Sequence, residues 1–331
     1  EIGLPYNDDI NSGDQEGIGP HQATIRDGRR ASTAQAYLKP ARNRPNLHIL
    51  PNATACKVMI EGKKAVGVTY LRKNKRDEAK AAREVLISAG AINSPQLLEL
   101  SGIGQAERLK DLGIDVVHEL KGVGENLRDH YAPRMKWTIP RSLALTYNVK
   151  GRGPRVVWEA LKYLFTDKGL LGITAAPLRA FVRTREGLEA PNAVIGWVPF
   201  LVGENFKLAK ESGITAFTHI LRSESQGNIH VTSADAKQPP AIRFNFLTAQ
   251  LDCDVTLEAM RITRNIMTAP ALDGIVTGEI TPGVDMDDDA ELLQWVRENS
   301  DISEDLPIFA FTAHAEDERA EDFSAMGFDY V

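Results

Sequence analysis

The stretch from Gly90 to Gly104, GAINSPQLLELSGIG, combines the exit of a strand, the start of a helix and a glycine stop within fifteen residues. Just before it, REVLIS at residues 83–88 predicts a short buried strand. Ser94 and Pro95 are typical of an N-cap followed by proline at the first helical position. The helix is therefore expected over residues 96–100, and the SGIG sequence after it supplies glycines at which helices commonly end.

A connection of this kind can bind an anion. Backbone N–H groups at a helix N-terminus are free, and residues without bulky side chains let a ligand approach closely. Many purely structural α/β connections have the same spacing, however. Spacing alone therefore leaves a structural role and a cofactor-binding role open.

The composition is typical of a globular protein of one large or two ordinary domains, with 331 residues, 43% of them hydrophobic and 25% charged. A net charge of -6 argues against a general nucleic-acid binder. The basic cluster at residues 72–76 is expected to be a solvated hairpin tip. The acidic run at 285–289 is expected to cap the next helix, because it lacks the spacing of an EF-hand calcium loop.

The two cysteines, Cys56 and Cys253, are too few for a disulfide framework and lack the spacing of a cysteine metal site. No metal site is therefore predicted. No apolar run approaches the length of a transmembrane segment, and no signal peptide is visible. The location stays open, with the cytoplasm or the periphery of the inner membrane as the expected places.

The pattern of expected elements changes near residue 132. Before it, α/β character is indicated by helices at 32–37 and 106–112 and by strands at 46–50, 54–61, 65–71, 84–88 and 115–118. After it, an antiparallel sheet with packed helices is indicated by strands at 179–184, 193–198, 215–221 and 227–232 and by helices at 154–166, 248–268 and 290–299. The fold class is therefore α/β plus α+β.

The opening stretch resembles the second signature of the glucose-methanol-choline (GMC) oxidoreductases, flavoenzymes that oxidise alcohols. The matching positions are Gly90, Ala91, Ser94, Pro95, Leu97, Leu98, Ser101, Gly102, Ile103 and Gly104. GVGENLRDH at 122–130 and SQGNIHVTSADAKQPPAIRFNFL at 225–247 resemble the choline-dehydrogenase and bacterial alcohol-dehydrogenase branch of the family. The resemblance covers roughly residues 1–300.

This resemblance implies a partial Rossmann-like FAD-binding domain over residues 1–131 and an antiparallel-sheet substrate-binding domain over 132–300, part of which can return to the FAD domain. It also implies hydride transfer from a small-molecule alcohol to N5 of FAD, followed by electron transfer to oxygen, a quinone or a cytochrome. The substrate and the acceptor are left open.

The resemblance also assigns cofactor-binding residues. It places the backbone of Ala55 beside the adenine of FAD, and small residues beneath its ribose and pyrophosphate. Ordinary strand packing is the alternative for Ala55, and turn or capping roles are alternatives for the loop residues near the flavin. The remaining assigned positions are Ser88, Ala89 and Gly90 beneath the dinucleotide, Ser94 and Pro95 at the helix start, and Asn126 and Asp129 in that loop.

Two parts of the family pattern are not found in the sequence. One is the GxGxxG turn that binds the FAD pyrophosphate. The other is the histidine base expected soon after residues 292–300, so no catalytic residue is assigned. His314 follows a different context, and surface or packing roles are expected for His21, His48, His118, His130, His219 and His230. We therefore expect the isolated chain to bind FAD weakly or not at all and to be inactive.

Residues 301–331 instead resemble the end of a response-regulator receiver domain. A fusion or an assembly artefact is the favoured explanation, and a divergent GMC ending is the alternative. Two other functions also stay open at this point. One is a signalling or regulatory protein with a receiver-like tail, and the other is a flavin-containing lyase with the GMC fold.

Overall fold

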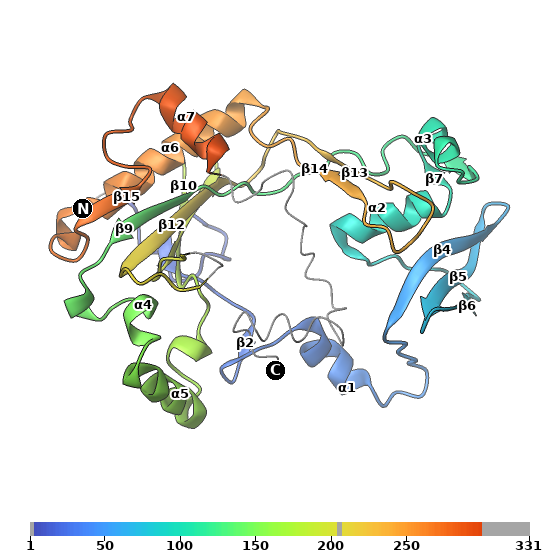
Figure 1. The fold of residues 1–331 in the computed structure, drawn as a ribbon, viewed down its shortest axis with the longest axis horizontal. Coiled ribbons are helices and arrows are strands. Elements are labelled where there is room, and N and C mark those ends of the chain that lie inside the picture. Colours follow the sequence, from blue (N-terminus) through green and yellow to red (C-terminus); the bar gives the residue numbers. More distant parts are fainter. Residues whose placement is uncertain (1–2, 204–206, 300–331) are drawn as a thin grey trace.

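The computed structural model describes residues 3–203 and 207–299, which form two lobes (Figure 1). The larger lobe contains a six-stranded antiparallel sheet with the strand order β1-β10-β11-β12-β9-β15. Its strands are β1 (Gly17–Pro20), β9 (Arg134–Thr138), β10 (Leu178–Val182), β11 (Ala193–Val198), β12 (Gly213–Ile220) and β15 (Gly278–Thr281). The large lobe therefore draws its sheet from residues on both sides of position 132.

One face of this sheet forms the main hydrophobic core with helices α6 (Gln250–Met267) and α7 (Asp289–Glu298). Side chains alternate between the faces of a strand. Met135 and Trp137 accordingly lie in the core, which also contains Met260 of α6 and Leu292 of α7. The side chain of Asp288 accepts hydrogen bonds from the first backbone N–H groups of α7, so the acidic run caps this helix as predicted.

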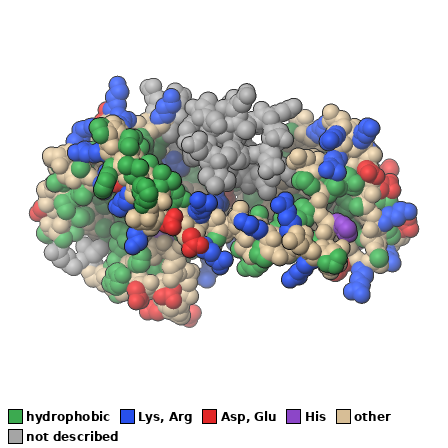
Figure 2. Space-filling model, turned by 90° about the horizontal axis from the view of Figure 1, so that it is seen from below, with side chains coloured by type: hydrophobic (Ala, Val, Ile, Leu, Met, Phe, Trp, Pro, Cys, Tyr) green, Lys and Arg blue, Asp and Glu red, His purple; other side chains and the backbone are tan. Residues whose placement is uncertain are grey.

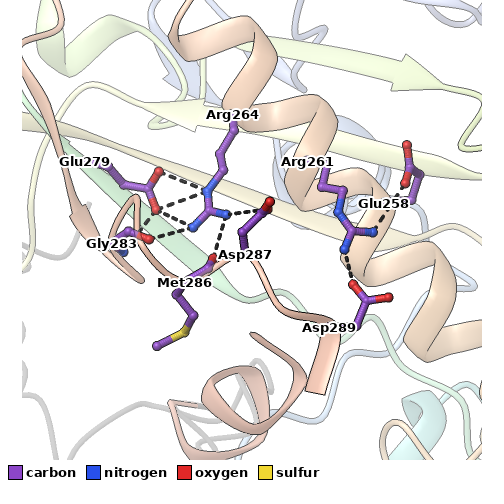
Figure 3. A network of polar contacts seen from close by, with 8 residues as sticks. All are labelled: Glu258, Arg261, Arg264, Glu279, Gly283, Met286, Asp287 and Asp289. Carbon is purple, nitrogen blue, oxygen red and sulfur yellow. Dashed lines mark hydrogen bonds and ion pairs between the residues drawn. The ribbon is translucent and has the colours of Figure 1, made fainter. Parts of the chain in front are cut away.

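Helix α6 is fixed to β15 by a polar network around Arg264 (Figure 3). The Arg264 guanidinium donates to both carboxylate oxygens of Glu279, at 3.1 and 3.0 Å, and its side chain and that of Glu279 are 14% and 3% exposed. It also donates to the backbone carbonyl oxygens of Gly283 and Met286, both at 2.8 Å. A single arginine thus joins the helix, the edge strand and the loop that follows the strand.

The second lobe is built around α2 (Gly90–Leu100) and a three-stranded antiparallel sheet of β4 (Ala53–Glu61), β5 (Lys64–Arg72) and β6 (Lys75–Lys80). A smaller core contains Leu100, Leu109, Ile114 and Val231. The other elements of this lobe are β7 (Ile103–Gly104), α3 (Ala106–Asp111), β8 (His118–Glu119), β13 (Asn228–His230) and β14 (Ala241–Arg243). Because β13 contacts α2, residues from the later half of the chain complete this lobe.

The remaining elements are short, apart from one helix, α5. Helix α5 (Pro154–Thr166) follows α4 (Tyr147–Lys150) at the lower edge of the large lobe in Figure 1. The others are β2 (Ile25–Arg26), β3 (Arg29–Arg30), the π-helical turn Ala34–Leu38, α1 (Lys39–Ala41), and the 3₁₀ turns Arg141–Leu143, Leu170–Gly172 and Pro270–Leu272. Within the described ranges, no helix is long and apolar enough to cross a membrane.

Three sequence-based expectations for the first 131 residues are wrong. Residues 83–88 and 46–50 form no strand, and Leu86 is 79% exposed. A strand needs a hydrogen-bonded neighbour, and none is supplied to either segment by the described residues. The helix begins at Gly90 rather than after Ser94, so Pro95 lies inside it. Separately, β7 and β8 are the only parallel pair among the named strands of the described chain, and the partial Rossmann-like domain expected over residues 1–131 stays a prediction.

Candidate functional site

The N-terminus of α2 is open and has no side-chain cap. Its N-cap residue is Ala89, and no side chain accepts a hydrogen bond from the first turn. Gly90 has a φ of +81°, which favours glycine, and a Cβ placed on it would meet no atom within 4 Å. Ser88 and Ala89 are exposed beside it. Free backbone N–H groups and open space at this helix end can accept an anionic group.

Ser94 and Pro95 lie within α2 rather than at its start. Proline in a helix interior lacks the N–H group that would donate to the carbonyl four residues earlier, here that of Ala91. The helix is held instead at its other end. Ser101 donates to the backbone carbonyl of Leu97 at 2.5 Å and accepts a hydrogen bond from the backbone N–H of Val58 at 2.8 Å. Ser101 of the motif is thus a structural link from α2 to β4.

Ala55 lies on the same lobe, exposed on β4. It pairs with Tyr70 of β5, and the register shifts between Ala55 and Lys57. Because β4 is an edge strand of its three-stranded sheet, one side of its backbone has no strand partner in this part of the structure. Its exposed backbone near Ala55 and the open start of α2 are therefore elements of one lobe, joined through the link from Ser101 to Val58.

Asn126 and Asp129 lie in the segment that runs from the second lobe to β9 (Figure 1). Asn126 is exposed with a φ of +61°, and Asp129 Oδ1 accepts a hydrogen bond from the backbone N–H of His130 at 2.8 Å. Leu127 pairs with Gly227 through two backbone hydrogen bonds of 3.0 and 2.8 Å. No hydrogen bond within the described ranges joins Asn126 or Asp129 to Ala55 or to residues 88–95.

A buried histidine between two glutamates supports this same segment, and sequence reasoning missed it. His230 Nδ1 lies 2.7 Å from Glu99 Oε1, and His230 Nε2 lies 3.0 Å from Glu125 Oε1. Glu99 is fully buried in α2 and also accepts a hydrogen bond from the backbone N–H of Val231 at 2.8 Å. Gly124 packs so closely that a Cβ there would lie 2.7 Å from His230 Nδ1. His230 therefore fixes the Gly124–Glu125 turn against α2.

The face of the six-stranded sheet opposite α6 carries a second group of residues that the sequence did not reveal. Arg179, Gly196, Phe217 and Arg134 form one cross-strand row, as the registers of β10, β11, β12 and β9 show. Arg179 Nε and His21 Nδ1 are buried, and neither has a hydrogen-bond partner within the described residues. Burial lowers the pKa of Arg179, and burial followed by the nearby Arg179 charge lowers the pKa of His21.

Two histidines stack on this face. The ring centroids of His219 and His130 lie 4.2 Å apart, and His219 is 8% exposed. The pKa of His219 is lowered to about 4, chiefly by burial. A hydrogen bond to the Ile220 carbonyl opposes this shift, and the nearby charges of His130 and Arg179 contribute to it. Of the surface and packing roles expected for His219, the structure shows packing, and the ring is uncharged at neutral pH.

A hollow of about 560 Å³ opens on the same face. It is lined by Arg134 and Lys136 of β9, Thr215 and Phe217 of β12, and Trp295 near the end of α7. The combination of aromatic, hydroxyl and cationic side chains suits a small polar organic molecule. No group of three or more histidine, cysteine or acidic residues that could hold a metal ion occurs in the described part of the chain.

The family models for GMC oxidoreductases match residues 1–132 and 223–304. The chain is 41% identical over 307 residues to the oxygen-dependent choline dehydrogenase of Ectopseudomonas mendocina, and 39% identical over 307 residues to that of Pseudomonas aeruginosa. Each alignment covers 92% of this chain and 54% of the relative. The chain thus spans about half the length of the curated relatives that it matches.

Solved structures of other proteins share this fold. A formate oxidase crystal structure has a TM-score of 0.81 at 23% identity, covering 90% of this chain and 56% of that chain. A pyridoxine 4-oxidase has a TM-score of 0.72 at 24% identity, covering 89% of this chain and 54% of that chain. The likeness extends across both lobes, and the receiver-like assignment of residues 301–331 lies outside the described residues.

Proposed function

Because the chain belongs to the GMC oxidoreductase family, we propose that it forms part of an FAD-dependent oxidoreductase that oxidises the CH–OH group of a small alcohol. The observation that carries this proposal is the similarity to oxygen-dependent choline dehydrogenases along 92% of the chain. The same relatives support oxygen as an electron acceptor. FAD supplies the group that accepts the hydride from the alcohol carbon.

The second lobe has features that fit FAD. The uncapped start of α2 suits a pyrophosphate, and the exposed Ser88, Ala89 and Gly90 leave space for a dinucleotide. The free edge of β4 near Ala55 offers backbone groups to an adenine edge. Ser94 and Pro95 would support this contact from within α2. Asn126 and Asp129 would approach the flavin from the connecting segment that His230 holds in place.

The large lobe would then supply the substrate side of the site. The hollow on its open sheet face is lined by Lys136, and the buried His219 on the same face stays uncharged at neutral pH. Cations on a pocket wall disfavour a quaternary ammonium group by like-charge repulsion. We therefore expect a neutral or anionic alcohol to be preferred over choline, even though the sequence is similar to choline dehydrogenases.

The complete gene product, loaded with FAD, tests both statements. Anaerobic addition of an alcohol should bleach the flavin absorbance near about 450 nm and yield the aldehyde. Choline and its uncharged isostere 3,3-dimethylbutan-1-ol form a matched pair, and kcat/KM should favour the isostere by about tenfold, or roughly 1.4 kcal/mol.

The outcomes of this assay are distinct. If no alcohol reduced the flavin, the proposed oxidoreductase activity would be contradicted. Cleavage of a cyanohydrin without flavin reduction would indicate lyase chemistry instead. A preference for choline would leave the oxidoreductase standing and contradict only the charge argument. For the 331-residue chain alone, which contains no GxGxxG turn, we expect the flavin absorbance to be lost on desalting.

A further inference from the structure

Helix α5 differs from an ordinary surface helix because its apolar side faces solvent, whereas its contacts with the protein are polar. Its partly buried residues are Glu159, Ala160 and Tyr163, which face the protein. The Tyr163 hydroxyl donates to the Gly28 carbonyl at 3.3 Å, and Glu159 Oε2 accepts a hydrogen bond from the backbone N–H of Leu170 at 3.2 Å. Polar contacts therefore attach α5 to the large lobe, and none of its residues is fully buried.

The opposite side of α5 is apolar and faces solvent. Trp158, Leu164 and Phe165 are 68%, 73% and 83% exposed. With Val157 and Leu161 they recur at the spacing of one helix face, so they form a continuous stripe, hereafter the α5 stripe. Figure 2 shows hydrophobic side chains gathered on this underside of the large lobe, with lysine and arginine beside them. Apolar patches of this kind mark surfaces that another body covers.

The charge around the α5 stripe indicates what that body is. Residues 141–173 contain six basic and two acidic residues, a net charge of +4, although the whole chain has a net charge of -6. Arg155 and Lys162 flank the stripe on α5 itself, and Lys168 follows the helix. Long cationic side chains at the border of an apolar face can reach anionic headgroups while their stems stay on the apolar side.

We propose that α5 docks this protein onto the surface of a bilayer containing anionic lipids, with the helix lying parallel to the membrane plane. With 13 residues α5 is too short to span a bilayer, for which about 20 apolar residues are needed. Trp158 belongs to a residue type enriched at the membrane–water interface. Protein–protein interfaces are depleted in lysine, so the lysines beside the stripe favour a lipid surface over a protein partner.

The test is sedimentation of the full chain with vesicles of phosphatidylcholine and phosphatidylglycerol in equal parts, and with vesicles of phosphatidylcholine alone. Binding is expected to the mixed vesicles, to weaken in high salt, and to shift the Trp158 fluorescence to the blue. Phe165→Glu should weaken binding by about tenfold or more. Val284→Glu is the matched control, because Val284 is 68% exposed and lies outside α5.

A second variant distinguishes a loss of membrane binding from misfolding. Lys162→Glu with Lys168→Glu leaves the apolar side chains in place and should weaken binding to the mixed vesicles only. Failure of the unaltered chain to sediment with the mixed vesicles would overturn the proposal. So would a stable dimer that Phe165→Glu dissociates, because a second copy would then cover the stripe. Equal binding by Phe165→Glu and Val284→Glu would overturn it as well.

Discussion

At the scale of single residues, His219 makes the stability of the folded chain depend on pH. Its pKa of about 4 in the folded chain lies below the ordinary 6.5, so the unfolded chain binds more protons between these values. Stability contributed by the neutral ring is therefore fully present above pH 6.5 and is lost as the pH falls towards 4. Between pH 7 and pH 5 this contribution falls by about 2 kcal/mol.

Urea unfolding at pH 7 and pH 5 checks this effect. His219→Phe keeps a ring stacked on His130 and removes the titrating group, so its loss of stability between the two pH values should be smaller by about 2 kcal/mol. His118→Phe alters an exposed histidine and should follow the unaltered protein. Identical pH profiles for all three proteins would show that His219 does not carry the dependence.

At the scale of elements, Arg264 holds α6, β15 and the following loop together. Arg264→Met would leave the Glu279 carboxylate, 3% exposed, without its cation, and should lower the free energy of unfolding by about 3–5 kcal/mol. Arg261→Met is the control on the same helix. Arg261 contacts Asp289 and Glu258 at the surface, so its loss should cost less than about 1 kcal/mol. Equal costs in chemical denaturation would contradict the assigned role of Arg264.

The sequence predicted correctly those elements that depend on their own residues and not on a partner elsewhere in the chain. The bounds of β11 and α5 match the expected 193–198 and 154–166, and the hairpin tip at 72–76 is confirmed by the β5–β6 turn. The strand predicted at residues 83–88 is absent because strand formation depends on a partner elsewhere in the chain. The start of α2 was misplaced because the positive φ of Gly90 allows the helix to begin before Ser94.

The candidate site was predictable only where one segment carries it. Ser88, Ala89 and Gly90 are consecutive, and their exposure beside an open helix end agrees with the sequence pattern. The stacking of His130 on His219 and the placement of His230 between Glu99 and Glu125 join residues about a hundred positions apart. Such juxtapositions follow from strand register and lobe packing, which local sequence patterns do not encode.

At the scale of the whole molecule, the two lobes have separate cores of unequal size. Among the residues that the structure describes, the main core contains twenty buried residues and the core around Leu100 and Val231 contains four, with none shared. A core of this smaller size contributes little hydrophobic stabilisation. We therefore expect calorimetry of the 331-residue chain to show two transitions, with the second lobe unfolding at the lower temperature.

The complete gene product should behave differently when FAD is bound. A ligand that binds only the folded state stabilises it by about 2.7 kcal/mol at one hundred times its dissociation constant. If FAD contacts α2 and the open sheet face together, that stabilisation acts on both lobes, and the two transitions should merge into one at a higher temperature. Hydrogen exchange at Leu97 and Ile195 would report each lobe separately. A rise confined to Leu97 would show that FAD binds the second lobe alone, and the open sheet face would then lie outside the cofactor site.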